Sequence, residues 1–251
     1  MSVALITAGS AGLGAAATRL FAKNGYRVVV NYANNDERAN KLLEELPALS
    51  SLPSDGGSEN FIAIKADLGS RDDIKRLIKE TVDKFGRLDV IFSNGGWTRF
   101  RGMDSIDDNA HEDEWDRAFN VNVKSHLWLM QAAKKHLDES EGAFITTASI
   151  AGVIPSGSSL AYAVTKAAQI HLMKALSFMA APKIRVNSVS PGLLLTDWAS
   201  SFPEEVKEAH RQRTKLKRFV SVEDVAEQVL TFAKSKSTTG VNIVMDAGFL
   251  P

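Results

Sequence analysis

Three side chains in the middle of the sequence could carry out proton transfer: a serine, a tyrosine and a lysine. Tyr162 and Lys166 are four residues apart in the segment 159–170, which contains no glycine or proline. In an α-helix this spacing places both side chains on one face. Because a nearby positive charge favours a phenolate, we expect Lys166 to lower the pKa of the Tyr162 phenol.

Ser149 follows an apolar run at 143–148 that is typical of a buried strand. A parallel strand delivers its last residue to the crevice where ligands bind. A hydroxyl, a phenol and a cation that meet there would form an acid–base site. Two plainer interpretations stay open at this point, since Tyr162 and Lys166 could form an ordinary solvated pair and Ser149 could cap a helix or turn.

The composition restricts the class of protein. The chain has 251 residues, of which 44% are hydrophobic and 24% charged, as in a globular protein with a substantial core. Its 30 basic and 30 acidic residues balance, which argues against nucleic acid or anionic membrane as a partner. The absence of cysteine excludes disulfides, thiolate metal sites and cysteine nucleophiles. Without a signal-peptide pattern or an apolar run of about 18 residues, we expect a soluble, cytoplasmic protein.

A glycine-rich turn lies near the N-terminus. Gly9, Gly12 and Gly14 stand between the apolar run 3–6 and a helical stretch at 15–23, and a β-branched run follows at 27–32. Strand, glycine-rich turn, helix and strand are typical of the start of a dinucleotide-binding fold, where the helix N-terminus binds a pyrophosphate. Such turns also use glycine for steric reasons alone, so this motif is weaker evidence than the triad.

Strand-like and helical segments alternate along the whole chain. The expected strands are 3–6, 27–32, 61–66, 88–93, 143–149, 184–190 and 241–245. The expected helices are 15–23, 36–46, 70–85, 112–137, 159–179, 203–213 and 222–234. This alternation predicts an α/β fold: one Rossmann-type, doubly wound sheet of seven mainly parallel strands with helices on both faces, in a single domain over 1–251. We interpret the segment 47–60 as a surface loop and not as a domain boundary.

Polar or glycine-rich signals follow five of these strands. Right-handed crossovers bring the C-terminal ends of parallel strands to one edge, where ligands bind. The five signals are the glycine-rich turn, Asp67, Asn94-Gly95-Gly96, Ser149 and Pro191-Gly192.

With these motifs, the sequence resembles the short-chain dehydrogenase/reductase family from Val3 to Gly248. The resemblance is carried by TAGSAGLG at 7–14, NGG at 94–96, Asn122, Ser149, Tyr162 with Lys166, and PGLLLT at 191–196. Two departures stand out: Ala8 occupies the first glycine position of the turn, and Ser93 replaces the first asparagine of the usual Asn-Asn-Ala-Gly. Because Gly12, Gly14 and Asn94 are kept, we expect the cofactor site to survive.

The resemblance implies an oxidoreductase that transfers a hydride between a nicotinamide and a ketone or secondary alcohol, as a carbonyl reductase does. Tyr162 would donate the proton, and Lys166 would lower its pKa from about 10 and bind the nicotinamide ribose. Ser149 would hold the substrate oxygen, and Asn122 would anchor a water that relays protons to Lys166. The five histidines show no spacing typical of a metal site, so no metal is expected.

The resemblance also implies a cofactor site along the C-terminal edge of the sheet. NADP(H) is favoured over NAD(H), because no carboxylate occurs at 30–35 to repel a 2′-phosphate. Against this, Ala11 stands where NADP-preferring relatives often have an arginine. Arg38 could take the place of that arginine. The expected cofactor-binding residues are Thr7, Gly9, Ser10, Gly12, Leu13, Gly14, Asn31, Tyr32, Ala33, Asp67, Leu68, Asn94, Gly95, Gly96, Tyr162, Lys166, Pro191, Gly192, Leu194 and Thr196.

The segments 99–109 and 193–216 should form the rim and lid of the substrate pocket. They and their neighbours supply Trp97, Phe100, Met103, Leu193, Leu195, Trp198 and Phe202, which suggests a cyclic or aromatic ketone, although the same residues could serve packing or a subunit interface. A homodimer or homotetramer through the helices at 112–137 and 159–179 is expected. Two rival functions remain: a non-catalytic nucleotide-binding regulatory protein, and an epimerase or dehydratase on a related fold.

Overall fold

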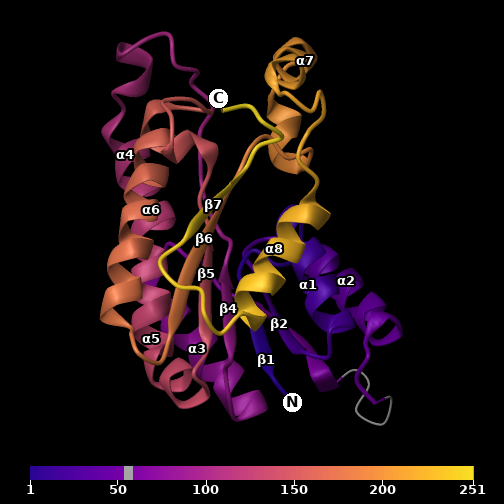
Figure 1. Ribbon diagram of the computed structural model, residues 1–251. Helices are drawn as coiled ribbons and strands as arrows, with labels where there is room; N and C mark the ends of the chain where they lie inside the picture. The colour runs from indigo at the N-terminus through magenta and orange to yellow at the C-terminus, as the bar shows by residue number, and fades with distance from the viewer. Residues whose placement is uncertain (54–58, 251) are drawn as a thin grey trace.

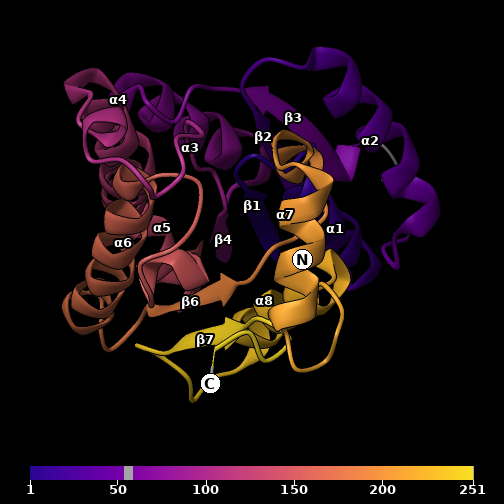
Figure 2. The same cartoon turned by 90° about the horizontal axis from the view of Figure 1, so that it is seen from above.

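Seven strands form one parallel sheet in the order β3-β2-β1-β4-β5-β6-β7, with every neighbouring pair parallel. The structure is a computed structural model that describes residues 1–53 and 59–250. The sheet confirms the predicted seven-stranded Rossmann-type fold, and it lies between two layers of helices (Figures 1 and 2). The strands are β1 (Val3–Ile6), β2 (Arg27–Tyr32), β3 (Phe61–Lys65), β4 (Val90–Ser93), β5 (Ala143–Thr147), β6 (Arg185–Pro191) and β7 (Asn242–Met245).

Two hydrophobic cores hold the helices to the two faces of the sheet. Alternate strand residues point to opposite faces: Ala4 and Ile6 pack in one core, whereas Val3 and Leu5 pack in the other. The first face carries α1 (Gly12–Lys23), α2 (Asp36–Leu49) and α8 (Val222–Lys234), and the second carries α3 (Arg71–Phe85), α5 (Ser125–Ser140) and α6 (Leu160–Met179). Two further helices, α4 (Glu112–Phe119) and α7 (Glu204–Arg213), lie towards the C-terminal ends of the strands (Figure 1).

Serine caps set the starts of several helices. The hydroxyls of Ser70, Ser159 and Ser221 accept hydrogen bonds from the N–H groups of Asp73, Tyr162 and Asp224, respectively. Each satisfies a backbone donor that would otherwise lack a partner at a helix start. The cap at Ser159 matters for function, because it fixes the turn of α6 from which Tyr162 projects.

Some predicted boundaries are wrong. The single helix expected over 112–137 is divided by a π-helical turn, Asn120–Lys124, and α5 then continues to Ser140. The helix expected to end at 46 runs through Pro47 to Leu49. Part of the predicted surface loop at 47–60, residues 54–58, lies outside the described residues. None of the described helices combines the length and apolarity that crossing a membrane requires.

Candidate active site

A cavity of about 620 Å³ opens at the C-terminal edge of the sheet, below α7. Ser149, Tyr162 and Lys166 all line it, although Ser149 follows β5 and the other two lie on α6. The predicted cofactor-binding residues that line the same cavity are Gly12, Leu13, Asn94, Gly96, Tyr162, Lys166, Pro191, Gly192, Leu194 and Thr196. The structure therefore brings the candidate catalytic triad and much of the candidate cofactor site into one space.

Tyr162 and Lys166 are adjacent on one face of α6, as their spacing predicts. The Lys166 Nζ lies 5.6 Å from the centre of the Tyr162 ring. It donates to the Thr147 carbonyl at 2.8 Å and to Gln169 Oε1 at 2.9 Å, and the residue is only 3% exposed. Lys166 is thus fixed between the end of β5 and its own helix.

Ser149 is held against the same helix. It precedes the 3-10 turn η4 (Ile150–Gly152), and its Oγ accepts from the Ala151 N–H at 3.1 Å. Ser149 is also close enough to the Tyr162 side chain to lower the pKa of the phenol. The hydroxyl therefore caps a turn and faces the site at once, so the two interpretations of this residue are compatible. Gly152 keeps η4 close to α6, because a Cβ there would lie 2.5 Å from the Lys166 backbone carbon.

The pKa values at this site are shifted mainly by burial. Burial raises the pKa of the Tyr162 phenol to about 12, against a smaller lowering effect of the Ser149 hydrogen bond. Burial also lowers the pKa of Lys166 to about 7. The expected lowering of the Tyr162 pKa is therefore wrong in direction, because desolvation disfavours the charged form of the phenol. Tyr162 is protonated at neutral pH and so can act as a proton donor.

Asn122 lies in the π-helical turn and does not line the cavity. Its Oδ1 accepts from the Trp97 N–H at 2.7 Å, and its Nδ2 donates to the Trp97 carbonyl at 2.8 Å and to Thr165 Oγ1 at 3.0 Å. This side chain ties the loop after β4 to α6. The predicted water relay to Lys166 stays a prediction.

The glycine-rich turn has Ala8 in a strained backbone conformation. Ala8 adopts the left-handed conformation with φ 47°, which costs a residue with a Cβ about 1–2 kcal/mol. The space behind Gly14 is filled, since a Cβ there would lie 2.1 Å from the Ala8 carbonyl oxygen. Residue Ala11 gives α1 no side-chain cap, and the first N–H groups of this helix, beside the cavity-lining Gly12 and Leu13, have no acceptor among residues 1–53 and 59–250. Such a helix start fits the pyrophosphate of a dinucleotide.

The other predicted cofactor-binding residues do not line the cavity, and two of them support its wall from behind. Thr7 Oγ1 accepts from the N–H groups of Asn94 and Gly95 at 2.8 and 3.1 Å, and Asn31 Oδ1 accepts from Ala8 at 3.2 Å. These two residues shape the turns that line the cavity. The predicted residues that do not line it are Thr7, Gly9, Ser10, Gly14, Asn31, Tyr32, Ala33, Asp67, Leu68 and Gly95.

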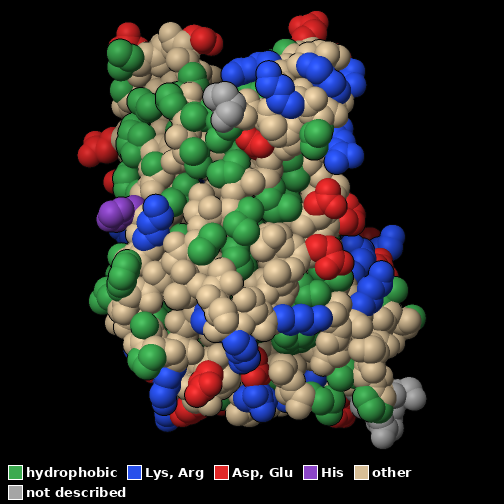
Figure 3. All heavy atoms as spheres, in the orientation of Figure 1, with side chains coloured by type: hydrophobic (Ala, Val, Ile, Leu, Met, Phe, Trp, Pro, Cys, Tyr) green, Lys and Arg blue, Asp and Glu red, His purple; other side chains and the backbone are tan. Residues whose placement is uncertain are grey.

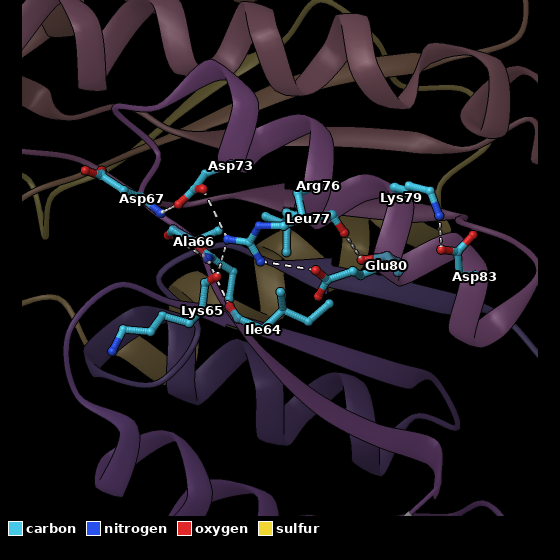
Figure 4. A network of polar contacts seen from close by, with 12 residues as sticks. Ile64, Lys65, Ala66, Asp67, Asp73, Arg76, Leu77, Lys79, Glu80 and Asp83 are labelled. Atoms are coloured by element: carbon cyan, nitrogen blue, oxygen red, sulfur yellow. Dashed lines mark hydrogen bonds and ion pairs between the residues drawn. The ribbon is translucent and has the colours of Figure 1, made fainter.

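An ion-pair network fixes the segment that follows β3. The Asp67 N–H donates to Asp73 Oδ2 at 2.8 Å, and Asp73 pairs with Arg76 at 3.2 Å. Arg76 donates in turn to the Lys65 carbonyl at 2.8 Å, as Figure 4 shows. The hydrogen bond from Asp67, together with Arg76, lowers the pKa of the Asp73 carboxyl. Asp67 is thus placed by its backbone, and its carboxylate binds Gly69 N–H at 2.8 Å.

The predicted lid supplies the apolar side of the cavity. Trp198 lies 6.0 Å from the Tyr162 ring, and Phe202 packs edge-on against Phe100 at 5.1 Å. Of the apolar residues expected in the pocket, Leu193, Trp198 and Phe202 line it, whereas Trp97, Phe100, Met103 and Leu195 do not. Sequence reasoning missed His210, Arg213 and Phe249, because no motif marks the residues that fold back over the cavity from α7 and from beyond β7.

His126 is a buried histidine behind the site, with its Nδ1 2.6 Å from Ser93 Oγ. Burial, and to a lesser extent the Lys166 charge, lowers its pKa to about 3. A histidine whose folded-state pKa is depressed stabilises the fold fully above its unfolded pKa of about 6.5 and loses that contribution as the pH falls towards 3. We therefore expect the free energy of unfolding to fall by about 3 kcal/mol from this residue between about pH 7 and pH 4.

Urea unfolding of His126→Leu at several pH values measures this effect. The variant should lose much less stability on acidification than the wild type does. The exposed His171 offers a control, since His171→Gln should lose as much free energy of unfolding on acidification as the wild type does. If the free energy of unfolding changed equally with pH in His126→Leu and in the wild type, His126 would not be held neutral in the folded protein.

Comparison with known proteins gives matches over nearly the whole chain. The model of a family described as enoyl-(acyl carrier protein) reductase matches residues 7–250. The 3-oxoacyl-(acyl-carrier-protein) reductase of Staphylococcus aureus is 34% identical over 249 residues, covering 98% of this chain and 96% of that protein.

Among solved structures, a short-chain dehydrogenase/reductase from Serratia marcescens superposes with a TM-score of 0.87 and 28% identity, covering 99% of this chain and 97% of that one. The NADPH-dependent 3-quinuclidinone reductase of Rhodotorula rubra gives a TM-score of 0.86 and 25% identity, over 99% of this chain and 91% of that one.

Proposed function

Since the chain belongs to the short-chain dehydrogenase/reductase family of oxidoreductases, we propose that it reduces a ketone to a secondary alcohol with NADP(H) as its cofactor. The observation that carries this proposal is the meeting of Ser149, Tyr162 and Lys166 at one cavity that also reaches the free start of α1. A regulatory protein that binds nucleotide without turnover has no use for this triad, and so the alternative is disfavoured.

Side chains of this protein have two tasks in the proposed reaction: one holds the carbonyl oxygen of the ketone, and another supplies the proton. A bound nicotinamide supplies the hydride, which goes to the carbonyl carbon. Ser149 Oγ holds the carbonyl oxygen and stabilises the charge that develops on it. Tyr162, protonated at neutral pH, gives its phenolic proton to that oxygen, which completes the alcohol. Lys166, with a pKa of about 7, can take up and release a proton near neutral pH and so helps to restore the phenol.

The preference for NADP(H) is supported by the residues near the end of β2. No carboxylate occurs between Val30 and Asn35 to repel a 2′-phosphate. Arg38, in the first turn of α2, lines the cavity and pairs there with Asp197 at 2.7 Å. Its guanidinium has several donors and can bind a phosphate while it keeps a second partner.

Replacing Arg38 by glutamine should weaken NADPH binding about ten-fold and leave NADH binding within about two-fold of the wild-type affinity. Only NADPH carries the 2′-phosphate that the guanidinium would bind, so only NADPH loses that contact. Titration of nicotinamide fluorescence measures both affinities. Lys41→Gln, on the same helix but outside the cavity wall, should bind both cofactors as the wild type does. An unchanged NADPH affinity in Arg38→Gln would assign phosphate recognition to other residues, and ten-fold tighter NADH binding by the wild type would overturn the NADP(H) preference.

The partners that we expect for this protein are a small ketone or alcohol and further copies of the same chain. Phe178 and Met179, at the end of α6, are 84% and 76% exposed, which supports a homodimer or homotetramer of a cytoplasmic protein through α5 and α6. Sedimentation at micromolar concentration showing monomer alone would contradict that assembly.

A panel of ketones and secondary alcohols, offered with both nicotinamides, tests the proposed reaction. The expected result is oxidation of NADPH, followed by its absorbance, with at least one cyclic or aromatic ketone. Binding of NADPH without turnover of any ketone would favour the regulatory alternative.

A further inference from the structure

We propose that this cavity selects ketones that carry an anionic group, a carboxylate or a phosphate, and that Arg213 at the cavity mouth is the residue that binds it. This inference deepens the proposed reductase function and rests on it. It follows from the charges along the cavity wall, from the way Arg213 is held, and from the apolar surface beside it.

Few charged groups line the cavity, and most of them already have partners. Arg38 pairs with Asp197 at 2.7 Å, and Asp197 is the one carboxylate that the described residues contribute to the wall. Lys166 donates to Thr147 and Gln169. Arg213 forms no ion pair and no side-chain hydrogen bond within residues 1–53 and 59–250. Of the three Lys and Arg side chains that line the cavity in the described part of the chain, Arg213 alone is thus without a hydrogen-bond or ion-pair partner, and it lies on the side formed by α7.

The Arg213 side chain is held over an aromatic ring. Its guanidinium carbon lies 4.3 Å from the centre of the Phe249 ring, and that ring stacks on His210 at 4.3 Å with an angle of 14° between the planes. Stacking uses the face of the guanidinium and leaves the N–H groups at its edge free, in the geometry that binds a carboxylate or phosphate with two hydrogen bonds.

Phe249 is itself fixed by the backbone of the C-terminal segment. The two carboxylate oxygens of Asp246 accept from the N–H groups of Gly248 and Leu250 at 2.9 and 2.8 Å. The Lys215 N–H donates to the Gly248 carbonyl at 3.1 Å, which ties this segment to the end of α7. Through these hydrogen bonds, the Asp246 carboxylate holds the segment that carries Phe249 and so positions the ring beneath Arg213.

More positive charge surrounds Arg213. Lys215, Lys217 and Arg218 follow it closely in the chain, and none of the three forms an ion pair within the described part of the protein. Figure 3 shows Lys and Arg side chains gathered at the upper right, over the region of α7. In a chain of net charge zero, this local excess of cations would draw an anion to the cavity mouth. Burial and the Arg213 charge both lower the pKa of His210, so its imidazole is neutral at neutral pH and the positive charge at this place comes from Arg213.

Apolar side chains complete the wall that Arg213 and Tyr162 share. Trp198, Phe202 and Val206 line the cavity together with them. A matching substrate has a carbonyl to meet Ser149 and Tyr162, an apolar body, and an anionic group at the mouth. That anion could be the carboxylate of an oxo acid or the phosphate of a thioester carrier such as coenzyme A.

Two matched pairs of ketones separate these sources. One pair is an apolar oxo acid and its amide, and the other is a 3-oxoacyl-coenzyme A and the N-acetylcysteamine thioester of the same acyl group, which lacks phosphate. We expect the wild type to prefer the anionic member of one pair by about ten-fold in kcat/KM, and the pair that shows the preference identifies the anion.

Arg213→Gln should reduce that preference to about two-fold or less, and Arg213→Lys should retain part of it. Arg218→Gln, a nearby charge outside the cavity wall, should keep most of the preference. Equal turnover of both members of each pair by the wild type, or a preference that survives in Arg213→Gln, would overturn the role of Arg213 while ketone reduction stands. If the wild type reduces no ketone at all, the reductase function fails and this inference with it.

Discussion

Tyr162→Phe is expected to lower kcat for ketone reduction by about three orders of magnitude, because the phenylalanine keeps the ring but removes the proton donor. The Tyr162 phenol has a pKa of about 12, so at neutral pH it keeps the proton that it would donate to the substrate oxygen. Steady-state kinetics at saturating ketone and NADPH measure the loss. Cofactor affinity should stay close to that of the wild type, which separates the chemical step from binding.

Tyr26→Phe is the matched control for this variant. Tyr26 packs edge-on against Phe21 at 4.9 Å, in the core on the other side of the fold, and does not line the cavity. Its loss of a hydroxyl should leave kcat unchanged. If Tyr162→Phe reduced ketones at the wild-type rate, the proton would have to come from another group, and the assignment of Tyr162 would be wrong.

Gly152→Ala is expected to lower kcat about a hundred-fold while destabilising the fold by about 1–3 kcal/mol. The added Cβ would lie 2.5 Å from the Lys166 carbon, 2.7 Å from its oxygen and 2.8 Å from the Ala167 nitrogen. All three are backbone atoms, which cannot rotate away. The turn η4 must therefore move off α6, and Ser149 moves with it, away from Tyr162.

Kinetics together with urea unfolding separate these two effects. Gly86→Asn provides the comparison, since nothing lies within 4 Å of a Cβ there and asparagine tolerates its φ of 72°. That variant should keep wild-type activity. If Gly152→Ala were folded, as stable as the wild type and fully active, the close packing of η4 on α6 would not position the site.

The fold and the triad could be predicted because they depend on local patterns. The alternation of β-branched runs with helical ones predicts a parallel sheet. The spacing of Tyr162 and Lys166 fixes their shared face once the segment is a helix. Ser149 could be placed near them because strand ends meet at one edge of the sheet.

What the sequence could not predict depends on packing between distant segments. The direction of the Tyr162 pKa shift follows from burial, which no local pattern reports. The π-helical turn around Asn122 forms where its amide binds the Trp97 backbone, 25 residues away. Phe249 and Arg213 meet through the hydrogen bonds of Asp246, and nothing in the spacing of these residues indicates that contact.

The most direct measurement of the central assignment follows a labelled hydride. NADPH carrying deuterium at the reactive carbon of its nicotinamide is incubated with the protein and a ketone, and mass spectrometry locates the label in the alcohol. We expect one deuterium on the carbinol carbon with wild-type protein, and with Tyr162→Phe a rate lower by about three orders of magnitude. No labelled alcohol with any ketone, although the cofactor binds, would contradict it.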